Sequence, residues 1–368
     1  MAVGFPTKVS YANGDVFSAS DINDTNGTIN LLTSTQFAAG KNKIINGDFR
    51  FNQRVFTSNT TSLAYNFDRW LQSNSGGTFT LTPQTFTPGA APVAGYEGST
   101  YLRGITASQS AVGDYALFEQ KIEDVRTLAG STATVSFYAK AATGTPKIGV
   151  ELSQNFGTGG SPSATVNTPA GSVTLSTSWV RYSISVAVPS ITGKTIGTSA
   201  NSSFLETNLW VSSGSTNATR ASSIGIQNNT FDIWGVQVEQ SATASSFQTA
   251  TGTIQGELAA CQRYYWRFNG NSNYNPLGTG YVTSTTTAQG YIPLPIVLRG
   301  SVTSVDYTNL SVVDGAAIYA STALTVGSSS ASVVRVDLTG LSGLTQFRPL
   351  AILLNNTANQ FLGFSAEL

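Results

Sequence analysis

Histidine is absent from this 368-residue sequence, and cysteine occurs only once, at Cys261. Without histidine the chain cannot form a Ser–His–Asp or Cys–His nucleophilic site, or a histidine-ligated zinc or iron site. A single cysteine excludes an intrachain disulfide and a cysteine-cluster metal site. Chemistries that depend on histidine or on a cysteine cluster are therefore excluded by composition.

Charged residues are also scarce. Lys and Arg total 19, Asp and Glu total 19, and together they make up 10% of the chain, whereas about 25% is usual. Without a basic excess to neutralise phosphates, we expect no nucleic-acid partner. No run approaches the ~18 apolar residues of a membrane span, so we expect no membrane insertion. The first residues lack a basic and an apolar region, and we expect no signal peptide.

The residues that are present indicate strands. Between 41 and 250, apolar residues alternate with polar ones over short runs, most clearly at 180–188. The run 231–238 is apolar on both faces, which predicts a central strand. Glycine- and serine-rich turns separate the runs. This pattern predicts an all-β jelly-roll β-sandwich over 41–250.

The pattern changes after residue 250. Ile254, Leu258, Cys261 and Tyr265 lie on one helical face, which predicts a helical linker over 251–269 with Cys261 buried. Strand patterns resume over 270–368 and predict a smaller C-terminal β-sandwich tip. Pro293 and Pro295 predict an edge or bulged strand within it.

Residues 1–40 form a separate segment. An Asn-Gly pair at 13–14 predicts a hairpin. Ile22, Ile29 and Leu32 then form a weak heptad stripe on a short helix. Such a helix is not stable alone. Three arrangements that would stabilise the helix remain open: docking on the following domain, bundling with copies of itself, and docking onto a larger assembly.

Several segments resemble bacteriophage virion proteins. Ile45-Asn46-Gly47-Asp48-Phe49 and Phe67-Asp68-Arg69-Trp70 resemble the opening of their jelly-roll domains, and 231–239 resembles the closing strand, which carbohydrate-binding modules share. The segments 258–265, 364–368 and 6–30 are also similar to parts of such fibre-like proteins. The resemblance implies a tail fibre or other virion protein. Such a protein is commonly homotrimeric, anchored to tail or capsid proteins by its N-terminus, made in the host cytoplasm and located in the virion.

Sugars are bound by aromatic faces with nearby polar side chains. We therefore consider exposed aromatics as glycan ligands, with ordinary packing as the alternative. Trp179 and Trp234 lie in strand patterns and are expected in the core. The candidates are Trp210, expected to be exposed, with Asn208 beside it, and Tyr274, Tyr281, Tyr307 and Tyr319 in the second sandwich.

Two kinds of carboxylate site were considered. The resemblance implies a structural calcium at Asp48 and Asp232, which provide the oxygen ligands that calcium prefers; no other cofactor is expected. Glycan hydrolysis needs two carboxylates about 5–10 Å apart. The acidic cluster of Glu119, Glu123 and Asp124 is interpreted instead as a solvated loop or strand edge with local ion pairs.

Asp68 and Arg69 are expected to form a charge-assisted pair that holds the start of the first sandwich. Taken together, the sequence predicts a non-enzymatic, homotrimeric virion fibre or spike. We expect it to attach to a host-surface receptor through a glycan. The alternative is a purely structural head fibre or capsid decoration protein that contacts no receptor.

Overall fold

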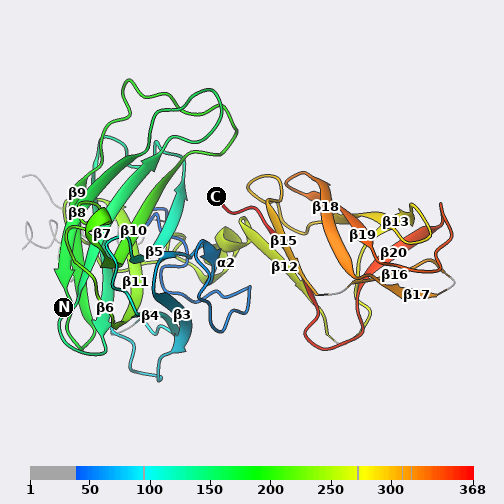
Figure 1. The fold of residues 1–368 in the computed structure, drawn as a ribbon, viewed down its shortest axis with the longest axis horizontal. Coiled ribbons are helices and arrows are strands. Elements are labelled where there is room, and N and C mark those ends of the chain that lie inside the picture. The colour runs from blue at the N-terminus through cyan, green and yellow to red at the C-terminus, as the bar shows by residue number, and fades with distance from the viewer. Residues whose placement is uncertain (1–38, 94–95, 272, 309, 316) are drawn as a thin grey trace, which may run out of the picture.

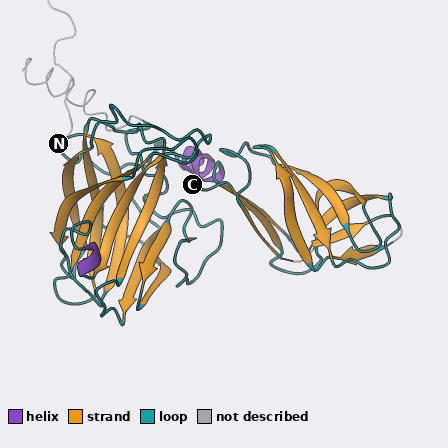
Figure 2. Ribbon diagram, turned by 45° about the horizontal axis from the view of Figure 1, so that its top comes forward, coloured by secondary structure: helices purple, strands orange, loops and turns teal. Residues whose placement is uncertain are grey.

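The computed structural model describes residues 39–368, apart from 94–95, 272, 309 and 316. Two β-sandwiches are joined by one short helix (Figures 1 and 2). The predicted all-β fold, a jelly roll followed by a smaller sandwich, is confirmed. The predicted N-terminal hairpin and helix, with Ile22, Ile29 and Leu32, lie outside the described residues. Within the described ranges no helix is long and apolar enough to cross a bilayer.

The first sandwich consists of two antiparallel sheets. The six-stranded sheet has the order β1 (Ala64–Tyr65), β2 (Leu71–Ser75), β5 (Tyr115–Glu123), β10 (Phe204–Ser213), β7 (Lys147–Asn155), β8 (Val166–Thr174). The five-stranded sheet has the order β3 (Thr78–Thr85), β4 (Thr100–Ala107), β11 (Thr230–Gln240), β6 (Thr132–Ala141), β9 (Val180–Ala187). As predicted from its two apolar faces, β11 is central. Trp234 lies fully buried in the core, and Trp179 packs half-buried against it.

The linker contains helix α2 (Ile254–Gln262). Thr253 caps its N-terminus by accepting a hydrogen bond from the Gly256 amide at 3.0 Å. Cys261 is fully buried, as predicted. The predicted third turn through Tyr265 is wrong, because Tyr265 begins strand β12 and pairs with the last strand of the chain.

The second sandwich also has two sheets. The smaller sheet has the order β12 (Tyr265–Asn269), β21 (Phe361–Ser365), β15 (Ser304–Tyr307). The larger has the order β17 (Ile318–Ala320), β16 (Leu310–Val313), β20 (Pro349–Leu354), β13 (Pro276–Val282), β14 (Ala288–Pro293), β19 (Val333–Thr339), β18 (Ala323–Ser329). The predicted proline-bearing edge or bulged strand is wrong. Strand β14 pairs on both sides in regular register, and Pro293 is tolerated because it is the last residue of the strand.

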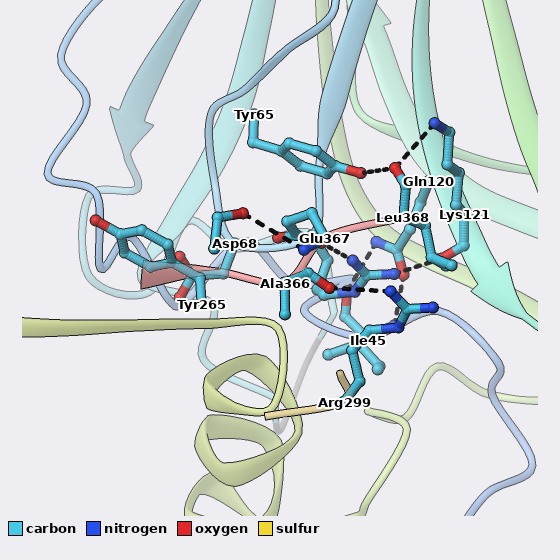
Figure 3. A network of polar contacts seen from close by, with 12 residues as sticks. Ile45, Tyr65, Asp68, Gln120, Lys121, Tyr265, Arg299, Ala366, Glu367 and Leu368 are labelled. Atoms are coloured by element: carbon cyan, nitrogen blue, oxygen red, sulfur yellow. Dashed lines mark hydrogen bonds and ion pairs between the residues drawn. The ribbon is translucent and has the colours of Figure 1, made fainter. Parts of the chain in front are cut away.

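The last residues of the chain lie against the first sandwich (Figure 3). The carbonyl oxygen of Leu368 accepts hydrogen bonds from Tyr65 Oη and Lys121 Nζ, both at 3.0 Å. Arg299 Nη1 donates to the Ala366 carbonyl at 3.1 Å. These bonds bring the second sandwich close to one end of strand β5.

A buried arginine completes this contact. Arg69, 1% exposed, forms an ion pair with Glu367, and its guanidinium lies 3.4 Å from the centre of the Tyr264 ring. Asp68 instead accepts hydrogen bonds from Gln53 at 2.9 and 3.1 Å. The predicted Asp68–Arg69 pair is therefore wrong, because Arg69 binds a residue brought close only by the fold.

Candidate functional site

A groove of about 340 Å³ lies on the outer face of the six-stranded sheet. Leu205, Leu209 and Val211 of β10 point into the core, so the alternating residues Glu206, Asn208 and Trp210 point outward. On β5 and β7 the same alternation directs polar side chains to this face. The groove is lined by Leu63, Ser73, Tyr115, Leu117, Glu119, Lys121, Asn155, Phe204, Glu206, Asn208, Trp210, Asn217 and Arg220.

Strand register assembles the polar floor of the groove. Asn208 lies opposite Glu119 of β5 on one side and opposite Glu151 of β7 on the other. Glu206 lies opposite Lys121, two residues further along β5. Residues directly opposite on antiparallel strands share a face, so three carboxyl groups and one amide meet across three strands.

Trp210 is covered rather than exposed. The loop after β10, which includes the 3₁₀ helix η1 (Ser215–Asn217), folds back over it, and Ala221 and Ile224 pack against the indole. Trp210 is 1% exposed, so the expectation that it is exposed is wrong. A glycine permits this closure, because a Cβ on Gly149 would lie 2.4 Å from the Ala221 carbonyl oxygen.

Glu151 holds this cover in place. It accepts two hydrogen bonds from the Arg220 guanidinium, both at 2.9 Å, and one from Trp210 Nε1 at 3.2 Å. Asn208 Nδ2 donates to the same carboxylate at 3.1 Å. Glu151 is fully buried. A buried charge is tolerated when it is paired and hydrogen-bonded in this way.

The remaining floor groups have free hydrogen-bonding capacity. Because Asn208 directs its nitrogen toward Glu151, its oxygen points the other way, and this buried Oδ1 has no hydrogen-bond partner. Glu119, 6% exposed, forms no hydrogen bond or ion pair within the described part of the chain. Its burial, together with the nearby Glu206 charge, raises the pKa of Glu119 to about 8. Burial also raises the pKa of Glu206.

The predicted acidic cluster is divided by the fold. The solvated interpretation of Glu119 is wrong, since it is buried in the groove. Burial raises the pKa of Glu123, but ion pairs with Arg263 and Arg299 outweigh this and leave it below its usual value. The exposed Asp124 pairs with Arg126, as expected for a surface ion pair. The carboxyl groups that do lie near Glu119, those of Glu151 and Glu206, were missed. For Glu206 the signal available in the sequence was its position two residues before the candidate Asn208, which places both side chains on one face of a strand.

The predicted tyrosines lie in the second sandwich, away from the groove lining. Tyr274 and Tyr281 are each 39% exposed. The hydroxyl of Tyr307 accepts a hydrogen bond from the Leu324 amide at 3.0 Å, and Tyr319 packs against the second core. These contacts give the last two tyrosines packing roles.

One exposed polar and aromatic row does cross the larger sheet of that sandwich. The Tyr281 hydroxyl donates to Gln289 Oε1 at 3.0 Å, and Gln289 Nε2 donates to the Tyr291 hydroxyl at 3.4 Å. Tyr291 is 49% exposed. This row is an exposed aromatic surface on the second sandwich, separate from the groove.

Asp48 and Asp232 do not fit a shared calcium site. Both Asp232 oxygens are taken by Arg103, at 2.7 and 2.9 Å, and Lys140 lies 3.6 Å away. Asp48 accepts from the Tyr96 hydroxyl at 2.7 Å. The two cationic side chains beside Asp232 would repel a calcium ion. Within the described ranges we find no group of three or more Asp, Glu, His or Cys side chains that could hold a metal ion.

Comparisons with known proteins find similarity in structure only. No family model matches the sequence, and no curated protein matches it. Tailspike protein 4 of bacteriophage CBA120, in its enzymatically active domain, matches with a TM-score of 0.30 and 18% identity over 54% of this chain and 21% of that one. The match thus spans about a fifth of the tailspike chain.

Two carbohydrate-binding domains match over most of their own length. A CBM4 module has a TM-score of 0.29 and 17% identity over 53% of this chain and 98% of its own. The CBM22-2 xylan-binding domain from Paenibacillus barcinonensis Xyn10C has a TM-score of 0.29 and 18% identity over 48% of this chain and 94% of its own.

Proposed function

We propose that this chain is a non-catalytic virion attachment protein that binds a glycan in the groove over β5, β10 and β7. The observation that carries the proposal is the buried, unpartnered Oδ1 of Asn208 on the groove floor, directly opposite the Glu119 carboxyl, which forms no hydrogen bond within the described part of the chain. A buried polar group without a partner costs about 1–3 kcal/mol. A ligand rich in hydroxyl groups recovers this cost by donating hydrogen bonds.

The two ends of the groove suit the rings of an oligosaccharide. Tyr115 and Phe204 line the groove and are both half-buried, so part of each ring faces the groove. Aromatic rings bind the apolar faces of sugars, while the polar floor sets orientation. This combination of aromatic rings and a polar floor supports glycan binding in the groove.

The virion role is supported by the sequence resemblance. We place the N-terminal segment 1–40, with its heptad stripe at Ile22, Ile29 and Leu32, against other virion proteins and against two further copies of the chain. A homotrimer presents three grooves, and avidity then compensates for a weak individual site. The same resemblance supports a structural fibre, which differs in having no glycan ligand.

A test of the proposal is to screen the purified full-length chain against an immobilised panel of bacterial oligosaccharides. Phe204→Ala and Glu206→Gln alter the groove, and Tyr281→Ala and Tyr291→Ala serve as matched controls in the second sandwich. We expect glycan binding that the groove variants weaken and the controls retain. Absence of binding to the whole panel and to host cells would favour the structural fibre.

Glycan cleavage is a second candidate, favoured by one observation. Glu119 and Glu206 are diagonal neighbours on adjacent strands, roughly 7–8 Å apart at the backbone, and the pKa of Glu119 is raised to about 8, as suits a general acid. The test is release of reducing ends from a bound oligosaccharide. Cleavage that Glu206→Gln abolishes would establish an enzyme and refute the non-catalytic proposal.

A further inference from the structure

The groove floor offers a group of hydrogen-bond acceptors, while several of its donors are already engaged by the protein. Arg220 Nε and Nη2 each donate a hydrogen bond to Glu151, and Lys121 Nζ donates one to the Leu368 carbonyl. Asn208 Nδ2 is directed to Glu151 and to Ser153 Oγ. The oxygens of Glu119, Glu206 and Asn208 remain as acceptors on the floor.

These acceptors are clustered. The Glu119 carboxyl has no hydrogen-bond partner in the described part of the chain, and Asn208 Oδ1 is buried and unpartnered. The Glu206 carboxylate has one long contact, 3.5 Å from Asn208 Nδ2. Register places Glu119 directly opposite Asn208 and Glu206 two residues along the same strand face. Three side chains with acceptor oxygens therefore share one region of the floor.

The charged side chains of the groove also favour a cationic ligand. Glu119, Glu151 and Glu206 carry three formal negative charges when ionised, whereas Lys121 and Arg220 carry two positive ones. The ionised groove thus lacks one positive charge. A primary ammonium group supplies one positive charge and three N–H donors with no acceptor, which matches three converging acceptors.

We propose that the groove selects an amino sugar with a free, unacylated amine, whose ammonium group is held by Glu119, Glu206 and Asn208 Oδ1. This inference rests on the proposed glycan-binding function and names its ligand class. Tyr115 and Phe204 line opposite ends of the groove, so each contacts a different ring of the oligosaccharide. An N-acetylated sugar loses both the charge and two donors, and an acidic sugar is repelled.

Binding of an ammonium group should release protons from the groove, and this release can be measured. In the empty groove near neutral pH the raised pKa of Glu119 keeps that carboxyl protonated. When the ammonium group enters, the Glu119 O–H bond breaks, the proton passes to the buffer, and the carboxylate accepts a hydrogen bond from the ligand nitrogen. Binding therefore releases up to about one proton per site, whereas a neutral sugar releases none.

The experiment is calorimetric titration of the full chain with a glucosamine trisaccharide and with its N-acetylated counterpart. Titrations are run at about pH 6.5, below the pKa of Glu119, in two buffers of different ionisation enthalpy. We expect the free amine to bind about 10- to 100-fold more tightly, the range given by hydrogen bonds to charged groups, and to release protons. Equal affinity of the two trisaccharides overturns the inference.

Two variants of strand β5 sharpen the test. Glu119→Gln keeps the shape but removes the titrating carboxyl, so proton release and the preference for the amine should disappear while any binding of the acetylated sugar remains. Glu123→Gln, on the same strand but paired with Arg263 and Arg299, should change neither. If Glu119→Gln binds the amine as the wild type does, the inference is wrong.

The remaining outcomes separate this inference from the proposed function. Binding of neutral hexose oligosaccharides in the groove, without amine preference, retains the proposed function and refutes the inference. Proton release by calcium chloride alone, equal to that caused by the sugar, shows a simple cation site and also refutes it. Failure of every oligosaccharide to bind refutes both.

Discussion

Replacement of Glu119 by glutamine should make the protein more stable, increasingly so as pH rises. Folding raises the pKa of this carboxyl from 4.5 to about 8 because it is buried beside Glu206. Between these two values the native state holds a proton that the unfolded chain has lost. Native stability therefore falls as pH rises through this window, and above the folded pKa a buried charge remains.

The magnitude follows from linkage. One proton of difference changes the free energy of unfolding by about 1.4 kcal/mol per pH unit. Over two units, for example pH 5.5 to 7.5, Glu119 should account for a loss of about 3 kcal/mol in the wild type. Glutamine does not titrate, so the advantage of Glu119→Gln over the wild type should grow by about this amount.

Urea unfolding followed by tryptophan fluorescence at a series of pH values measures this difference. Glu123→Gln is the matched control, since folding lowers the pKa of Glu123 and the sign reverses. That variant should be less stable than the wild type near neutral pH, and the difference should vanish as pH falls below the native pKa. Parallel pH profiles for Glu119→Gln and the wild type would refute the buried, proton-holding role of Glu119.

Three further predictions concern the packing around the groove and the junction. Arg69→Met should destabilise the protein by up to about 3–5 kcal/mol, seen as a lower Tm, because it leaves the buried Glu367 with only its 3.4 Å ion pair to Arg54. The Cys261 thiol, whose pKa is raised by burial, should react with a disulfide reagent only after unfolding; rapid reaction of the native chain would contradict its burial. Gly149→Val should displace the loop over Trp210, increasing iodide quenching of its fluorescence, and unchanged quenching would contradict the close packing there.

The strand pattern of the sequence was sufficient to predict the fold class. Alternation of side chains has the same period in the sequence and in a sheet, so runs such as 135–139 and 180–188 lie in strands β6 and β9. The C-terminal end of helix α2 was harder to predict. Tyr265 has the helical spacing, but in the fold it pairs as a strand residue with Ser365, a hundred residues away in sequence. Long-range pairing of this kind has no local signal.

The site was predicted only in part for the same reason. Asn208 and Trp210 were identified as candidates, but their expected exposure came from a nearby turn, and the covering loop with Arg220 could not be inferred from local sequence. Glu119 was assigned to an exposed acidic cluster because Glu123 and Asp124 follow it closely in sequence. Its true neighbours lie on strands 32 and 87 residues away in sequence, so only the register of β5, β10 and β7 reveals the groove.

The central claim is that this groove is the glycan site. It is tested most directly by calorimetric affinities of the wild type, Phe204→Ala and Tyr281→Ala for the best ligand from the oligosaccharide panel. The account predicts that Phe204→Ala weakens binding by about tenfold or more, the effect of losing one aromatic contact of about 1.4 kcal/mol, while Tyr281→Ala binds as the wild type does. Retained affinity in Phe204→Ala, with loss in Tyr281→Ala, would contradict the account and place the site on the second sandwich.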